Sequence, residues 1–482
     1  MTLPPISASA AARAERLYHQ GIACLEAGQG QQAEAHLRQA LALAPQLTRA
    51  RANLGYVLEE RGAWAEAEAA YRRALAEDPG LGPVWLNLGG LLLSRGRAEE
   101  ALPVCLQTLT LLPGAAAAWV NLGAACICLE DFAQGERCLL KALSLEPDRP
   151  SAHINLAYLL LRQGRYEAGW ECFEARPWYR ELAAHAHCPR WRGEAPTGRH
   201  LLVLCEAGHG DMIQFCRYLP LLEARGARLS LVCQPALVRL CAALPGVERV
   251  IPLADLPGAR GDWDAWVPLM SLPRHFATRV DSIPAALPYL QAGAPERQAW
   301  RRRLPAAGLR VGLAWRGNPR FENDGERSLP GLWPLAPLAA VPGIALVSLQ
   351  KGEAEEEALW PPAGMHIAAL GSELTDFADT AALIANLDLV IAVDTAVAHL
   401  AAALGVPCWL LLPRYKTDWR WLEGRQDSPW YPGVMRLFRQ ERRGDWDEAV
   451  ARVAGELAAG AAGATPDSGA PALEVGAHGE GA

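Results

Sequence analysis

The chain has 482 residues, of which 51% are hydrophobic and 21% charged, and this composition excludes both a single small module and a disordered protein. Its 46 Lys and Arg residues against 53 Asp and Glu residues give a net charge of −7, without a dense basic run that would bind nucleic acid. The 12 cysteines lack the spacing of zinc-binding motifs, which predicts free thiols in a reducing cytoplasm.

The start of the chain and its uncharged stretches bear on localisation. Residues 1–12 lack the basic and apolar regions of a secretory signal. Two uncharged stretches, 101–129 and 395–413, are interrupted by Pro and Gly residues, which is not typical of a membrane-spanning helix. We therefore expect a cytoplasmic protein without a membrane span.

A 34-residue period marks the first third of the chain. Two sets of residues recur with it: Gly21, Gly55, Gly89 and Gly123, and Pro45, Pro79, Pro113 and Pro147. Gly lets paired helices approach closely, and Pro ends the second helix of each pair. The pattern resembles the tetratricopeptide repeat, with four units over 14–149 and a fifth that fades after Phe173. We predict an α-solenoid over 14–176 whose concave surface binds a partner.

Beyond Pro177 the period stops, and apolar runs of strand length alternate with helical segments, which predicts an α/β fold. The strand-like runs are 201–205, 228–233, 309–315, 344–349, 389–393 and 406–412. A Pro-rich stretch, 284–305, divides this alternation into two rounds. We predict two Rossmann-like domains, at 199–300 and 308–458, followed by a disordered tail at 459–482.

Polar loops follow several predicted strands, at the edge where open α/β sheets bind ligands. The first loop contains Gly208, His209, Gly210, Asp211 and Gln214. Asp211 falls at the start of a predicted helix, where its carboxylate either caps the helix or acts in catalysis. Glu206 and His209 are the alternative bases of the same loop.

The loop after 389–393 places Asp394 and Thr395 at the start of a helix, where free N–H groups and the positive end of the dipole can hold a diphosphate. His399 lies about one turn beyond Thr395, either at the ligand or as a hydrogen-bonded core histidine.

The loops after 309–315 and 344–349 add positive and polar side chains. Arg316 and Asn318 follow the first of these strands, and Lys351 follows the second. All three can reach anionic oxygens, although Lys351 would also be unremarkable as a surface lysine.

Residues 199–458 resemble a bacterial family of tetratricopeptide-repeat glycosyltransferases whose catalytic part is similar to the heptosyltransferases. The matching segments are 208–220, 271–273, 312–318, 327–328, 348–350, 379–381, 394–400, 419–421, 428–432 and 438–440. The resemblance implies a two-domain GT-B fold, with an acceptor site in the N-terminal half and a nucleotide-sugar site in the C-terminal half. It also implies that Asp211 is the general base and that Asp394, Thr395 and His399 lie in the donor-binding segment.

Two Asp-x-Asp triplets, 262–264 and 445–447, share their spacing with a metal-binding motif of other glycosyltransferases. Asp262 precedes a short predicted strand and Asp445 opens a terminal helix, and adjacent carboxylates on such segments are usually solvated. Neither a dinucleotide-binding nor a P-loop pattern occurs. We predict no metal site and no cofactor, since the nucleotide sugar is a substrate.

The sequence thus predicts an inverting, metal-independent glycosyltransferase that moves a sugar from a nucleotide-sugar donor to a protein or glycan hydroxyl, with the repeats as a docking surface for the acceptor. Two alternatives stay open: a repeat-based interaction scaffold, or a sugar-nucleotide-binding regulator, each with an inactive glycosyltransferase-like domain. The polar loops favour the enzyme, because an inactive domain would lose them first.

Overall fold

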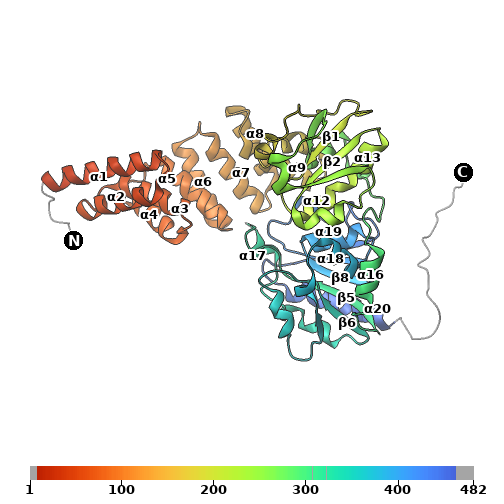
Figure 1. The fold of residues 1–482 in the computed structure, drawn as a ribbon. Helices are drawn as coiled ribbons and strands as arrows, with labels where there is room; N and C mark the ends of the chain where they lie inside the picture. Colours follow the sequence, from red (N-terminus) through yellow and green to blue (C-terminus); the bar gives the residue numbers. More distant parts are fainter. Residues whose placement is uncertain (1–7, 307, 322, 463–482) are drawn as a thin grey trace, which may run out of the picture.

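The computed structural model describes residues 8–306, 308–321 and 323–462 (Figure 1). An elongated array of paired helices comes first, and it abuts two α/β units. Its helices are α1 (Ala8–Glu26), α2 (Gly30–Leu43), α3 (Thr48–Glu60), α4 (Trp64–Glu77), α5 (Gly82–Ser94), α6 (Ala98–Leu111), α7 (Ala116–Cys128), α8 (Phe132–Leu145), α9 (Pro150–Arg162) and α10 (Tyr166–Phe173). The predicted helical repeat array is therefore confirmed.

Small residues set the spacing of the paired helices, as the 34-residue period predicts. Gly55 in α3 lies directly against the ring of Tyr71 in α4, where an added methyl group would come within 2.6 Å of the ring. Gly123 in α7 faces Leu139 in α8 in the same way, at 3.0 Å. A larger residue at either position would force the paired helices apart.

The first α/β unit holds a parallel sheet with strand order β3-β2-β1-β4. Its strands are β1 (His200–Leu204), β2 (Arg228–Cys233), β3 (Val247–Pro252) and β4 (Ala265–Pro268). The associated helices are α11 (Arg180–Ala183), α12 (His209–Phe215), α13 (Leu219–Ala224), α14 (Val238–Cys241), α15 (Leu272–His275) and α16 (Ala294–Arg301). The predicted helix that starts at Asp211 is broken into α12, a 3-10 turn and α13, because Pro220 has no N–H to continue the ladder.

The second unit holds a separate parallel sheet with strand order β10-β9-β8-β5-β6-β7. Its strands are β5 (Leu309–Ala314), β6 (Ile344–Ser348), β7 (Ile367–Ala369), β8 (Leu389–Val393), β9 (Cys408–Leu412) and β10 (Met435–Arg439). The helices are α17 (Asp324–Arg327), α18 (Phe377–Ile384), α19 (Ala396–Ala403) and α20 (Asp447–Ala462). Two sheets with all-parallel strands confirm the predicted α/β class, whereas the exact domain boundaries stay a prediction.

One expected boundary needs correction at the C-terminal end. The disordered tail was expected from residue 459, but α20 continues to Ala462 because its Ala-rich sequence favours helix. The remaining part of the expected tail, 463–482, lies outside the described residues.

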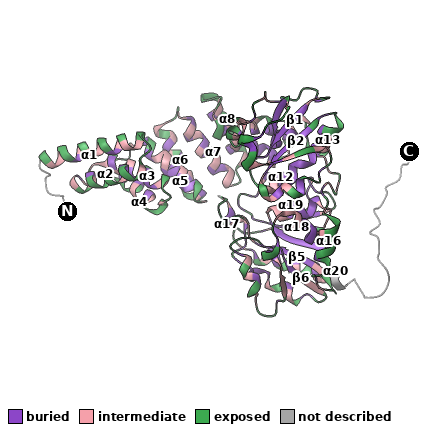
Figure 2. Cartoon of the chain, viewed as in Figure 1, coloured by how far each residue is buried: buried purple, intermediate pink, exposed green. Residues whose placement is uncertain are grey.

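The last repeat shares one hydrophobic core with both α/β units. Trp170 of α10, Leu201 of β1 and Ala392 of β8 belong to the same buried cluster. β1 and β8 are buried along their whole length, which Figure 2 shows as purple strands in the two units. Because this core is continuous, the end of the repeat array helps to fix the position of the sheet edges that carry the polar loops.

Candidate active site

The helices that follow β1 and β8 meet at their N-terminal turns. α12 and α19 lie next to each other between the two sheets (Figure 1), and a methyl group on Gly210 would come within 3.0 Å of His399 and 3.4 Å of the Ala396 Cα atom. The loops expected to hold acceptor and donor are thus brought together across the boundary of the two units.

Asp211 faces this boundary from the first turn of α12. Its Oδ2 atom accepts the Gly208 N–H at 2.8 Å, and its Oδ1 atom forms an ion pair with Arg420 of the second unit. Burial raises the pKa of Asp211, while the charge of Arg420 acts to lower it. Asp211 therefore takes part in capping α12 and also forms an ion pair with the opposite unit, and its catalytic role stays a prediction.

Arg420 is the residue that joins the two units, and sequence reasoning assigned it no role. It stands in the 3-10 turn Trp419–Trp421 after β9 and is 6% exposed. Besides Asp211, its guanidinium donates to Gln214 Oε1 at 2.5 Å and to both oxygens of Asp418 at 3.0 Å. The available signal was its place after a predicted strand, at the same sheet edge as Asp394.

Asp394 and Thr395 lie between β8 and α19, as predicted. Asp394 Oδ2 accepts the indole N–H of Trp421 at 2.8 Å, and burial raises the pKa of Asp394 to about 6. Thr395 is the N-cap residue of α19, and its buried Oγ1 atom has no hydrogen-bond partner within the described residues. The hydroxyl is thus free to bond a ligand at this turn.

His399 occupies the environment expected for a core histidine. Its Nδ1 atom lies 2.8 Å from the Tyr431 hydroxyl, and its ring stacks on Trp421 with centroids 5.4 Å apart. Burial lowers the pKa of His399 well below its usual value, so the ring is neutral. It fills space between α12 and α19 and keeps Trp421 in place.

The predicted phosphate-binding side chains already have partners within the second unit. Arg316 lies 3.5 Å from Glu357, and Lys351 Nζ donates to the Gly371 carbonyl at 2.8 Å. Asn318 is exposed and accepts the Arg320 N–H at 3.0 Å. In the described part of the chain none of these three hydrogen-bonds Asp394 or Thr395, so reaching a diphosphate there requires their side chains to change partners.

Arg327 is a second positive group that the candidate residues omitted. Its guanidinium lies 3.2 Å from Asp324, and its charge opposes the increase in pKa that burial causes at Asp211 and Asp394. Its sequence position in the loop after β5 was visible, but its effect on Asp211 depends on how the two units pack.

The remaining residues of the first loop have structural partners. His209 packs on the Phe377 ring at a centroid distance of 5.1 Å, and burial lowers its pKa. Glu206, an alternative base in the sequence reading, is held by Arg176 at 2.7 Å with both side chains fully buried. Glu206 therefore supports the fold rather than facing the boundary of the two units.

Carboxylates of the Asp-x-Asp triplets accept hydrogen bonds from other groups of the protein. Asp262 accepts from His200 at 2.9 Å, Asp264 accepts the His200 N–H at 2.7 Å, and Asp445 accepts the Asp447 N–H at 3.2 Å. Among the residues with described positions, no group of three or more His, Cys, Asp or Glu side chains is arranged to hold a metal ion.

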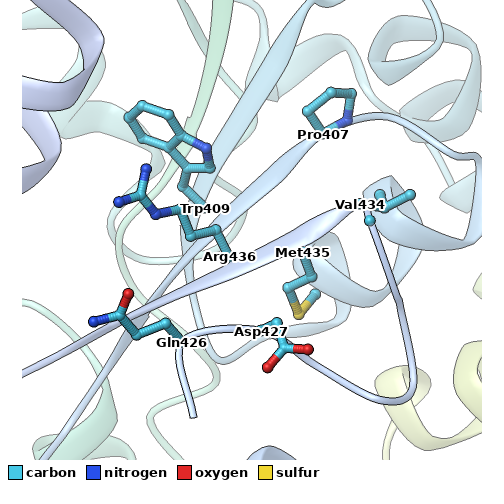
Figure 3. Close-up of a pocket in the computed structure, with 8 residues that line it drawn as sticks. Pro407, Trp409, Gln426, Asp427, Val434, Met435 and Arg436 are labelled. Carbon is cyan, nitrogen blue, oxygen red and sulfur yellow. The ribbon is translucent and has the colours of Figure 1, made fainter. Parts of the chain in front are cut away.

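A hollow of about 580 Å³ lies away from these residues, beside β9 and β10 (Figure 3). Its lining residues are Pro407, Trp409, Gln426, Asp427, Gly433, Val434, Met435 and Arg436. None of the predicted site residues lines it.

Over the same described ranges, no helix is both long and apolar enough to cross a membrane.

Two family models match parts of the chain. Residues 343–410, from β6 to β9, match glycosyltransferase family 9 (heptosyltransferase), and residues 49–175 match the C-terminal domain of cilia and flagella-associated protein 70. The first match contains Lys351, Asp394, Thr395 and His399, whereas Asp211 lies outside it.

Individual proteins are similar over parts of the chain. Protein FlbA of Caulobacter vibrioides is 30% identical over 339 residues, which cover 62% of this chain and 54% of FlbA. The chain thus spans about half the length of this curated relative. Among solved structures, MamA from Desulfovibrio magneticus RS-1 has 22% identity and a TM-score of 0.32, covering 34% of this chain and 92% of that one. Pseudomonas aeruginosa PilF has 28% identity and a TM-score of 0.32, covering 36% and 82%.

The fold and the family matches agree with the resemblance found in the sequence. The repeats come first, and the part that matches glycosyltransferase family 9 lies in the second parallel sheet and its loops. The protein has a tetratricopeptide-repeat array joined to a glycosyltransferase-like α/β region.

Proposed function

We propose that the protein is an inverting, metal-independent glycosyltransferase that moves a sugar from a nucleotide-sugar donor to a hydroxyl group of a protein or glycan. The observation that carries this proposal is the meeting of α12 and α19, which brings the half-buried Asp211 and the turn at Asp394 and Thr395 to the same boundary between the two units. The match of residues 343–410 to glycosyltransferase family 9 supports the same reaction class.

Asp211 is the general base of the proposed reaction. A hydroxyl group is a poor nucleophile at neutral pH, and a positioned carboxylate that removes its proton contributes on the order of 10²–10⁴-fold to the rate. Burial raises the pKa of Asp211, which makes it a stronger base than a solvated aspartate. The acceptor oxygen then attacks the anomeric carbon as the bond to the diphosphate breaks on the opposite face, which inverts the configuration.

The donor side supplies charge stabilisation for the leaving diphosphate. The first N–H groups of α19 and the Thr395 hydroxyl form a turn that can hold a phosphate, and Arg327 and Arg420 add positive charge nearby. Asp394 accepts the Trp421 indole N–H through Oδ2, and in the proposed site its other carboxylate oxygen accepts from a sugar hydroxyl. Arg316, Asn318 and Lys351 contribute once they leave their present partners.

A panel of nucleotide sugars tests the proposal by single-turnover hydrolysis and transfer, with the product's anomeric configuration read by NMR. Asp211→Asn should stay folded, bind the donor and lose at least about a hundredfold in turnover. Asp281→Asn is the matched control, because Asp281 is exposed and pairs with Arg279 in the same unit. Turnover of Asp211→Asn within a few-fold of the parent would contradict the assignment.

The same panel separates the alternatives. Donor binding without turnover would favour a regulator, and neither binding nor turnover would favour a scaffold built on the repeats. Turnover that persists after exhaustive chelation supports the metal-independent reaction, whereas recovery only on adding a divalent cation would contradict it.

A further inference from the structure

Arg420 forms one set of bonds within its own turn and another set across the boundary to α12 of the first unit. Asp418 lies two residues away in the same turn and accepts from Arg420 through its side chain at 3.0 Å, so this pair stays together whatever the units do. Asp211 and Gln214 belong to α12 of the other unit. Separation of the two units, or a competing anion, therefore breaks the bond to Asp211 while the bond to Asp418 survives.

Several carboxylates compete for the guanidinium of Arg420. Asp211 and Asp418 bond it directly, and Asp394 also acts on it electrostatically. Arg327 is the other cation that acts on Asp211 and Asp394, but it already pairs with Asp324. A diphosphate entering beside α19 is a stronger partner for a guanidinium than one carboxylate, because it offers more acceptor oxygens and more charge.

We propose that the donor diphosphate takes Arg420 from Asp211, so that donor binding itself frees the catalytic carboxylate. This inference rests on the proposed function. While Arg420 holds Asp211, the positive charge opposes protonation and offsets part of the increase in pKa that burial causes. Once Arg420 turns to the diphosphate, Asp211 loses its counter-charge and faces an anion, so its affinity for the acceptor proton rises. The base is thereby activated only when a donor is present.

Inorganic pyrophosphate is the probe, with its affinity measured by calorimetry on the full chain. Asp211→Asn should bind it at least about tenfold more tightly than the parent, because a charged hydrogen bond no longer has to be given up. The same substitution also removes a negative charge, so it is repeated in an Arg420→Gln background, where the gain should fall below about threefold. If thermal melting shows that Arg420→Gln is unfolded, Arg420→Met replaces it, because this variant also lacks the charge and fills the buried space with an apolar side chain.

Proton uptake gives a second measurement that needs no change at Arg420. Pyrophosphate binding near neutral pH, followed in two buffers of different ionisation enthalpy, should take up more protons in the parent than in Asp211→Asn. The other charged or titratable groups around the site, Asp394, Asp418, Arg327 and His399, are present in both proteins and cancel in the difference. Asp281→Asn, at an exposed carboxylate that pairs with Arg279, is the matched control, and it should keep the proton uptake of the parent.

An equal gain from Asp211→Asn in both backgrounds, an affinity unchanged by Asp211→Asn, or no pyrophosphate binding to either protein would overturn the inference. Turnover of a nucleotide sugar together with an unchanged affinity would refute the inference alone. The expected pyrophosphate pattern without turnover from any donor would instead refute the proposed function and leave the exchange at Arg420 standing.

Discussion

The ion pair between Arg176 and Glu206 joins the end of the repeat array to the first sheet. Replacing Arg176 by Met tests how much this pair contributes to the free energy of unfolding. Both side chains are 0% exposed, and two hydrogen bonds of 2.7 and 2.8 Å connect them. Arg176 also donates to the Ser271 hydroxyl at 2.7 Å and to the Phe173 carbonyl at 3.0 Å. Without Arg176, Glu206 keeps the Met270 N–H as its remaining bond in the described structure.

The expected loss in the free energy of unfolding follows from leaving a buried carboxylate without its counter-charge. Arg176→Met should lower the free energy of unfolding by about 3–5 kcal/mol, because removing one partner of a buried pair strands the other charge. Adding Glu206→Gln to this variant removes the stranded charge and keeps an acceptor for the Met270 N–H. The double variant should therefore recover about 2 kcal/mol relative to Arg176→Met.

Urea unfolding followed by tryptophan fluorescence measures both effects. The chain has several structural units, so the comparison uses the transition in which the first sheet unfolds and not a single global midpoint. A cost below about 1 kcal/mol for Arg176→Met, or a double variant as unstable as the single one, would refute the reasoning.

Two further predictions concern the contact between α12 and α19. Asp394→Asn should stabilise the protein by about 3 kcal/mol above pH 6 and by nothing near pH 4, because burial raises the pKa of Asp394 to about 6. The cost of this carboxyl group to folding therefore grows between about pH 4 and pH 6 and is constant at higher pH, and thermal melts across this range check the slope. Gly210→Ala should lower the urea midpoint, since the new methyl group meets His399 at 3.0 Å, whereas Gly455→Ala, in open space on α20, should leave it unchanged or raise it. Equal effects of the two glycine substitutions would show that the packing argument is wrong.

Much of the fold was predictable because its signals are local. The helix pairs follow from a fixed period of Gly and Pro, and the runs at 228–233 and 389–393 coincide with β2 and β8. Three strands were not predicted. β3 carries Glu248 and Arg249 in its middle, β7 has three residues, and β10 contains Arg436, so none of them forms an apolar run of strand length.

The candidate site was predictable only in part, because some residues that meet there are far apart in the sequence. Asp211, Asp394 and Thr395 each follow a strand end, and that position is visible in the sequence. Arg420 meets Asp211 across 209 residues, in a turn whose place depends on tertiary packing. Arg327 lies in the same unit as Asp394 and acts on Asp211 through the packing of the two units, which no local pattern encodes.

The repeat array is part of the scaffold that holds Arg420. The Arg420 guanidinium lies 4.4 Å from the Trp419 ring, and this ring meets the Trp170 ring of α10 with centroids 5.4 Å apart. Tyr166 of the same helix accepts the Trp430 indole N–H at 3.1 Å, which closes the cluster against the second unit. The position of the guanidinium opposite Asp211 therefore depends on an intact last repeat. A shortened chain that separates the binding role of the repeats from catalysis must keep α9 and α10, because a deletion that includes them would disturb both properties together.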